Sequence, residues 1–349
     1  MQSKNSGSNI LNNRFIVLDF ARGFAAFTIL IFHTYQYEMF SSLYSSVDFF
    51  FVLSGFVLLP SIDRIKSKID ILNFIRSRAV RLLPMSIATI IFVIFIQKIV
   101  DIKHFIFKEY DKEGVSLDPK TLIIAFLLLQ IFSTNAQLLN GPLWSLSVEW
   151  LSNIAIAIFP STRSIRYALP LVFGITLQIH SMSGGASWEM PLGRGLFAFA
   201  FGAVTRKYIY EKWQNTRLKT LTCVVLILIF HSVLIFWNSD LIAVAPLVFA
   251  FLILNLSKLD NSLPKAFLGV SHFFGRYSYG FYAWHFPLLM LNSVFIRRLL
   301  SNIPEVSGWT IHVVFITTIG LSLLMTNLVI RYIEPKAREL FLPRYPSKP

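Results

Sequence analysis

Long apolar stretches dominate this sequence and restrict what it can fold into. A helix needs about 20 apolar residues to cross the hydrocarbon core of a bilayer, and it satisfies its own backbone hydrogen bonds there. Strands of a membrane barrel are shorter and alternate in polarity, so the pattern favours helices. We therefore expect an all-α integral membrane protein. The eleven candidate stretches are residues 15–36, 45–61, 82–100, 121–138, 143–160, 166–182, 192–205, 219–237, 240–257, 277–296 and 310–331.

Composition also argues for a membrane protein rather than a soluble one. Only 14% of the 349 residues are charged, whereas soluble proteins carry about 25%. The net charge of +14 raises the question of a nucleic-acid partner, but the Lys and Arg residues fall in short blocks between the apolar stretches. Such blocks are typical of cytoplasmic loops facing anionic lipid, so we expect the lipid bilayer as a partner and no nucleic acid. A single cysteine, Cys223, excludes a disulfide framework and a cysteine-rich site, and we expect no metal.

The positions of the basic residues predict which stretches cross. Eleven crossings would put the termini on opposite sides, yet both termini are basic. If residues 121–138 are instead re-entrant or interfacial, the basic block at 206–219 falls on the cytoplasmic side with most other Lys and Arg residues. We therefore expect about ten transmembrane helices with both termini cytoplasmic. The expected organisation is a flexible cytoplasmic tail at 1–14, a single transmembrane domain at 15–334 and a cytoplasmic C-terminal tail at 335–349.

Ionisable residues inside a membrane are costly, so each is a candidate for function. In the first stretch Asp19 and Arg22 are three residues apart and share a helix face. Either they merely neutralise each other, or Asp19 holds Arg22 as a positive site for a phosphate or carbonyl. His33 lies about 16 Å further along the same face, by helix rise and rotation. Its imidazole is suited to accept a proton near neutral pH, although packing alone would also explain a histidine there.

The next two stretches carry further polar candidates. Asp48 lies near the outer end of the second stretch, where it either orients His33 or faces water, and Ser54 lies in mid-membrane beside a glycine. Arg78 and Arg81 are one helical turn apart just before the third stretch. They either anchor the protein at the inner surface or bind the phosphates of an anionic cofactor.

Two later segments bring a glutamate and a second histidine into the membrane. Glu149 lies about 9 Å into the membrane from the outer surface by helix rise, at a depth similar to His33. The two side chains are therefore candidates for an acid/base couple. His285 precedes a proline and is interpreted first as a hydrogen-bonded structural residue. Trp144 is either an interfacial aromatic residue or a platform for a sugar ring.

Five segments, taken together, resemble the acyltransferase-3 family of integral membrane O-acyltransferases. Each is weakly specific alone, but they occur in the family's order, and the resemblance extends from Phe15 to about Glu334. The segments are Arg22 and His33 with ten residues between them, Phe-Phe-Val-Leu-Ser-Gly-Phe at 50–56, Arg-x-x-Arg at 78–81, Leu-Trp-Ser-Leu-Ser-Val-Glu-Trp at 143–150, and Ser-Tyr-Gly-Phe-Tyr-Ala-Trp-His-Phe-Pro at 278–287.

The resemblance implies an enzyme of the inner or cytoplasmic membrane. It would take an acyl group, usually acetyl, from cytoplasmic acyl-CoA and place it on a hydroxyl of a carbohydrate at the outer face. The carbohydrate, free or lipid-linked, and the choice between acetyl and a longer acyl or succinyl donor stay open. The oligomeric state also stays open.

The candidate residues fit that reaction. A polar tunnel through the bundle would bring the thioester to His33, which either deprotonates the acceptor hydroxyl or accepts the acyl group itself, with Glu149 in support. The expected catalytic residues are His33, Glu149, Asp19 and Arg22; the expected cofactor-binding residues are Arg22, Arg78, Arg81 and Ser54; the expected substrate-binding residues are Trp144, Asp48, Tyr282 and His285.

A transporter or a flippase of a lipid-linked sugar is the main alternative. Ten spans with intramembrane Asp, Arg, His and Glu residues also describe a solute pathway. An internal repeat would favour that reading, and the sequence shows none. A purely structural scaffold would leave these costly polar residues unexplained.

Overall fold

The computed structural model describes residues 15–35, 38–99, 117–159, 165–214, parts of 219–232, 244–259, 265–299 and 307–342. Helices account for nearly all of these residues, and no strand occurs among them. The principal helices are α2 (Ile16–Tyr35), α3 (Ser46–Asp63), α4 (Lys68–Ile99), α5 (Pro119–Phe126), α6 (Thr134–Leu139), α7 (Leu143–Ile158), α8 (Ile165–Met182), α9 (Glu189–Val204), α11 (Ala245–Leu256), α12 (Lys265–Leu299), α13 (Ser307–Leu328) and α14 (Glu334–Phe341).

The helices have the length and composition of a membrane protein. Within the described residues, four helical segments are long and apolar enough to cross a bilayer: Ile16–Tyr35, Ser42–Asp63, Lys68–Gln97 and Trp309–Phe341. An all-α membrane fold is therefore confirmed. The number of about ten crossings and the cytoplasmic location of the termini stay predictions. The tail at 1–14 and most of the stretch at 219–237 lie outside the described residues.

The stretch at 121–138 does not form one long helix. It is divided among α5, a three-residue 3-10 turn and α6, and the longest of these has eight residues, about 12 Å of helix. Asp118 and Ser133 cap α5 and α6 by accepting hydrogen bonds from backbone N–H groups. Between them, Gln130 is held against α7 by hydrogen bonds with Ser147. No part of this stretch is a helix long enough to cross, in agreement with a re-entrant or interfacial segment.

Small residues let the central helices approach backbone to backbone. A Cβ added at Gly55 of α3 would lie 1.8 Å from the carbonyl oxygen of Phe199 on α9, and one added at Gly202 of α9 would lie 2.0 Å from that of Val52. Glycine is thus required on both sides of this contact. The α3–α9 contact fixes the position of α3, which carries Ser54 on its neighbouring face.

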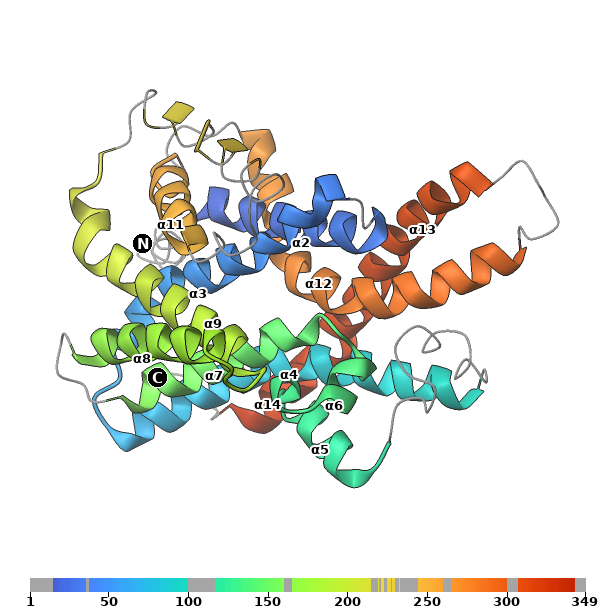
Figure 1. The fold of residues 1–349 in the computed structure, drawn as a ribbon, viewed down its shortest axis with the longest axis horizontal. Helices are drawn as coiled ribbons and strands as arrows, with labels where there is room; N and C mark the ends of the chain where they lie inside the picture. Colours follow the sequence, from blue (N-terminus) through green and yellow to red (C-terminus); the bar gives the residue numbers. More distant parts are fainter. Residues whose placement is uncertain are drawn as a thin grey trace, which may run out of the picture.

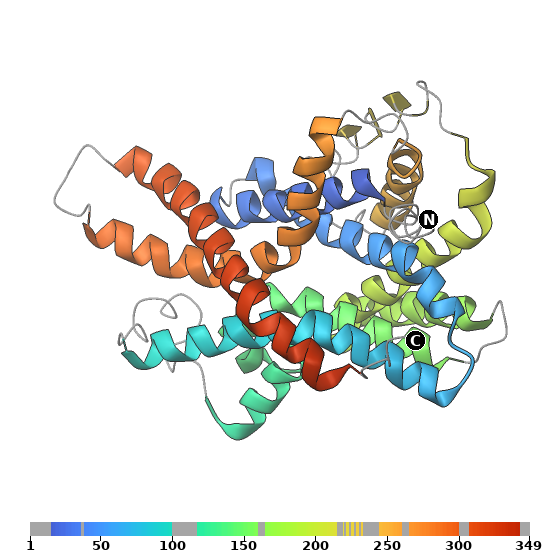
Figure 2. The ribbon, with the colours of Figure 1, turned by 180° about the vertical axis from the view of Figure 1, so that it is seen from behind.

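Further helices pack around this α3–α9 pair and along α12. α2 packs along α12, and α12 pairs with α13 as a long hairpin (Figures 1 and 2). α7 and α8 lie beside α9 (Figure 1). Because α9 also contacts α3, the helices α3, α7 and α9 are close neighbours. The last helix, α14, continues from a π-helical turn at the end of α13 and packs against α4. Residues 335–341, expected as part of a tail, are therefore helical and contact α4, although none of their side chains is buried.

Substitution of Gly55 tests the close approach of α3 and α9. Because the added methyl group would overlap a backbone carbonyl, Gly55→Ala should destabilise the protein by about 1–3 kcal/mol or more and lower its melting temperature in detergent. Gly320→Ala is the matched control, since a Cβ at Gly320 meets nothing within 4 Å. Equal melting temperatures for both variants and the wild type would contradict this packing.

Candidate functional site

One cavity of about 420 Å³ collects most of the polar residues singled out in the sequence. Its wall includes Arg22 from α2, Arg78 and Arg81 from α4, and Arg338 from α14, and we call it the arginine cavity. Glu149 from α7 is the only acidic residue among its described lining residues. The cavity therefore carries an excess of positive charge and is suited to an anionic ligand.

The two arginines of α4 reach the cavity because they are one helical turn apart. The Nε atom of Arg78 is buried and has no hydrogen-bond partner within the described part of the chain. A buried donor without a partner is unfavourable, so a ligand oxygen placed here would be stabilising. This geometry favours the phosphate-binding interpretation of Arg78 and Arg81 over simple surface anchoring.

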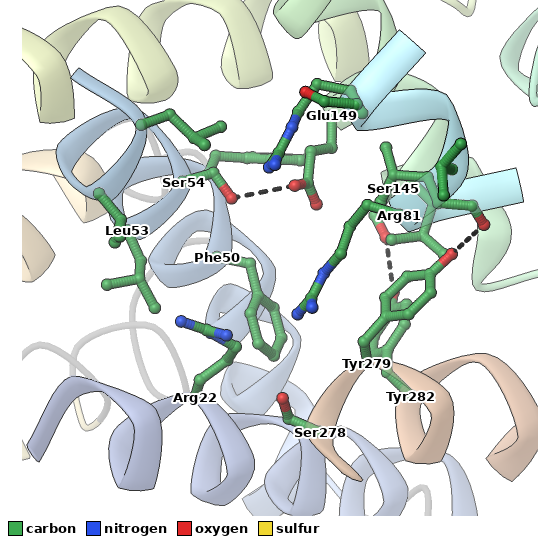
Figure 3. A pocket seen from close by; sticks show the side chains of 18 of the residues that line it. Arg22, Phe50, Leu53, Ser54, Arg81, Ser145, Glu149, Ser278, Tyr279 and Tyr282 are labelled. Carbon is green, nitrogen blue, oxygen red and sulfur yellow. Dashed lines mark hydrogen bonds between the residues drawn. The ribbon is translucent and has the colours of Figure 1, made fainter. Parts of the chain in front are cut away.

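Arg22 is held in the wall by the partner that its spacing predicts. Its guanidinium lies 3.1 Å from the carboxylate of Asp19, and the Asp19 side chain is only 9% exposed. Asp19 in turn packs against the backbone of α12 at Gly275, where a side chain would collide with the carboxylate. The ion pair thus fixes the direction of Arg22, which extends toward the cavity (Figure 3).

Ser54 and Glu149 join α3 to α7 across the same cavity. The Ser54 hydroxyl donates a hydrogen bond of 3.1 Å to Glu149 (Figure 3). Arg22 and Arg81 extend into the space below this pair, on either side of the Phe50 ring (Figure 3). The polar atoms of α2, α3, α4 and α7 therefore converge on one volume.

Two tyrosines of α12 form the opposite wall. The Tyr279 hydroxyl donates to the carbonyl of Leu82 on α4, and the Tyr282 hydroxyl donates to the carbonyl of Pro142. Tyr282 also lies 2.7 Å from the hydroxyl of Ser145 on α7. These bonds make the wall a hydrogen-bonded link between α4, α7 and α12.

His33 lines a second cavity of about 400 Å³, which we call the histidine cavity. Trp144, Gln97 and Gln137 also line it, together with many apolar side chains. None of its described lining residues is Asp, Glu, Lys or Arg. This cavity is therefore suited to a neutral ligand that has both hydroxyl groups and apolar surface.

His285 lies behind His33 and lines neither cavity. The two imidazole centroids are 5.3 Å apart, and His285 is fully buried. Its Nδ1–H donates to the carbonyl of Tyr282, so its Nε2 is left as an acceptor with no partner within the described residues. His285 therefore packs beside the His33 ring, and its expected role in substrate binding stays a prediction.

The two cavities share no lining residue within the described part of the chain, so they are separate volumes here, and the continuous tunnel stays a prediction. Tyr282 and Ser145 face the arginine cavity and Pro142 faces the histidine cavity. We call these three residues the dividing wall. Glu149 lies on the arginine side of it and His33 on the other, and the structure does not bring this predicted acid/base couple together. Helix rise gives depth along each helix but not the separation of the helices, which explains the difference.

Asp48 is also placed differently from the sequence interpretation. It is fully buried and forms an ion pair of 2.6 Å with Arg194 of α9. It lines neither cavity, neither faces water nor contacts His33 in a hydrogen bond, and instead joins α3 to α9. The sequence gives no signal for Arg194 or Arg338. Arg194 lies near the start of the stretch 192–205, and Arg338 lies in the expected C-terminal tail.

Comparisons with known proteins identify the domain. No curated protein and no solved structure gives a significant match to the chain. The family model of the acyltransferase-3 family, described as an acyltransferase domain, matches residues 15–327. This range covers the arginines of α2 and α4, His33 and His285, and the dividing wall. The chain therefore belongs to the acyltransferase-3 family.

Proposed function

We propose that this membrane acyltransferase moves an acyl group, in the simplest case acetyl, from cytoplasmic acyl-CoA to a hydroxyl of a carbohydrate at the outer face of the cell membrane. The observation that carries the proposal is the contrast between the two cavities. One has four arginines and one glutamate in its wall, and the other has a histidine and no Asp, Glu, Lys or Arg among its described lining residues. An anionic donor and a neutral acceptor need such a pair of sites.

The arginine cavity supports binding of the donor. CoA carries phosphate groups, which arginine side chains bind with strong, charge-assisted hydrogen bonds. The buried Nε of Arg78 has no hydrogen-bond partner among the described residues, and the ion pair with Asp19 already orients Arg22. In this proposal the phosphates bind at Arg78 and Arg81, and the pantetheine arm runs past Ser54 toward the dividing wall.

The histidine cavity supports binding of the acceptor. The indole of Trp144 offers a face for a sugar ring, and Gln97 and Gln137 offer amide groups for its hydroxyls. The apolar remainder of the cavity also fits the lipid part of a lipid-linked sugar. Carbohydrate is therefore the acceptor class we propose.

His33 is the group that prepares the acceptor hydroxyl. Its ring takes the proton of the hydroxyl, the oxygen attacks the thioester carbonyl, and the carbon–sulfur bond breaks to release the CoA thiolate. The thiolate then takes the proton from the His33 imidazolium, which restores the base. Attack by the His33 nitrogen, giving an acyl-imidazole first, is the other route. The position of His33 on the acceptor side favours the first route. Glu149 is assigned to the donor side with Ser54.

The dividing wall must open or be threaded for transfer to occur. The hydrogen bonds of Tyr282 to Pro142 and Ser145 close it in the present structure. We propose that the thioester displaces Tyr282 when both substrates are bound. A closed wall in the absence of acceptor would protect the thioester from hydrolysis.

Replacement of His33 tests its role as base. Loss of a positioned general base should lower acyl transfer by at least about a hundredfold, while acetyl-CoA binding stays close to that of the wild type. The measurement is the release of CoA thiol by membranes that contain His33→Ala protein, with the mass of surface glycans as a second readout. His312→Ala is the control, because His312 is exposed and lines neither cavity. Transfer by His33→Ala at the wild-type rate would refute the assignment.

Replacement of Arg78 or Arg81 tests the donor site. Loss of one charge-assisted hydrogen bond should weaken acetyl-CoA binding by about 1.5–3 kcal/mol. Acetyl-CoA should therefore raise the melting temperature of the wild type more than that of either alanine variant. Arg76→Ala is the matched control, since Arg76 lies on the same helix, is exposed and lines no described cavity.

Two results of this thermal assay would contradict the donor-site assignment. Equal stabilisation of all four proteins would show that Arg78 and Arg81 serve only as surface anchors. No stabilisation of the wild type by acetyl-CoA would contradict the proposed donor and favour the transporter alternative.

A further inference from the structure

A third cavity, of about 610 Å³, adjoins the arginine cavity and is not used by the proposed reaction. We call it the side cavity. Arg22, Arg81, Tyr279 and Arg338 line both cavities, so the two volumes meet at these four side chains. The side cavity extends from there between α2, α4, α12 and α14.

The side cavity is rich in basic groups. Arg276 and His272 of α12 are added to the shared Arg22, Arg81 and Arg338. Its acidic lining residues are Asp19, which is paired with Arg22 at 3.1 Å, and Glu334. Four arginines against two carboxylates leave an excess of positive charge, which fits a ligand group with phosphate oxygens.

The C-terminal helix supplies part of this charge. Glu334 and Arg338 are four residues apart and therefore share the helix face that lines the side cavity. Lys336, two residues away, is exposed and lines no described cavity. This helix lies beyond residue 327, where the family match ends.

We propose that the side cavity binds the 3′-phosphate of the CoA nucleotide, with Arg276 and Arg338 as its ligands. This inference rests on the proposed function. CoA has a diphosphate between its pantetheine arm and its nucleotide, and a separate phosphate on the ribose. In this proposal the diphosphate binds at Arg78 and Arg81 in the arginine cavity. Because Arg81 also lines the side cavity, the ribose phosphate extends into the side cavity, away from the thioester. Arg338 then recognises the donor from a part of the chain outside the family match.

The same phosphate chemistry is present in anionic lipid headgroups, which the test must separate from the nucleotide. Binding of acetyl-CoA and of acetyl-dephospho-CoA, which lacks only the 3′-phosphate, is measured by calorimetry on the purified full-length protein. One series uses neutral detergent, and a second uses bilayer discs with and without phosphatidylglycerol.

The wild type should bind acetyl-CoA about ten- to a hundredfold more tightly than acetyl-dephospho-CoA, as expected for one or two charge-assisted hydrogen bonds. Arg338→Ala and Arg276→Ala should bring this ratio close to one, and Arg338→Lys should retain part of it. Lys336→Ala is the matched control and should keep the wild-type ratio. Arg78→Ala should weaken both ligands alike and leave the ratio unchanged.

The contrary outcomes are distinct. Equal binding of both ligands by the wild type, or an unchanged ratio in Arg338→Ala and Arg276→Ala, would overturn the inference and leave the donor site in place. Loss of the wild-type ratio when phosphatidylglycerol is added would show that a lipid phosphate occupies the side cavity, and would also overturn it. No binding of either ligand by the wild type would instead refute the proposed function.

Discussion

Charge in the low-dielectric interior of a helical bundle is stable only beside an opposite charge or well-placed hydrogen-bonding groups. Several charged side chains in the described part of the chain follow that constraint. Arg22 is paired with Asp19, Arg194 with Asp48, and Glu149 accepts from Ser54. Around the arginine cavity, however, basic side chains outnumber acidic ones, and a buried nitrogen of Arg78 has no partner in the described chain. The fold thus holds an excess of positive charge where an anionic ligand would compensate it.

The site depends on how closely the helices approach. Gly55 and Gly202 bring α3 and α9 into backbone contact, and Gly275 leaves room for the Asp19 carboxylate between α2 and α12. The hydroxyls of Tyr279 and Tyr282 then tie α12 to α4 and to the segment before α7. Separate helices are in this way fixed around one polar volume, while the dividing wall keeps it apart from His33.

Much of the helical pattern could be predicted from hydropathy, and pairs on one helix could be predicted from spacing. Asp19 with Arg22 and Arg78 with Arg81 are such pairs, because three residues make nearly one turn. Contacts between helices could not be predicted in the same way. Depth along the helices predicts a pair of Glu149 with His33, yet Glu149 accepts a hydrogen bond from Ser54, and Asp48 is paired with Arg194. Arg338 was missed because a polar segment after the last apolar stretch gives no signal that it continues the last helix and contacts α4.

The most direct test is a structure of the protein with acetyl-CoA bound, determined by electron cryomicroscopy in a lipid disc. The phosphates should lie against Arg78 and Arg81, and the thioester should point toward Tyr282 and Ser145 with His33 on the opposite side of them. Acetyl-CoA bound elsewhere, or an arginine cavity that stays empty at saturating ligand, would contradict the assignment of this cavity to the acyl donor.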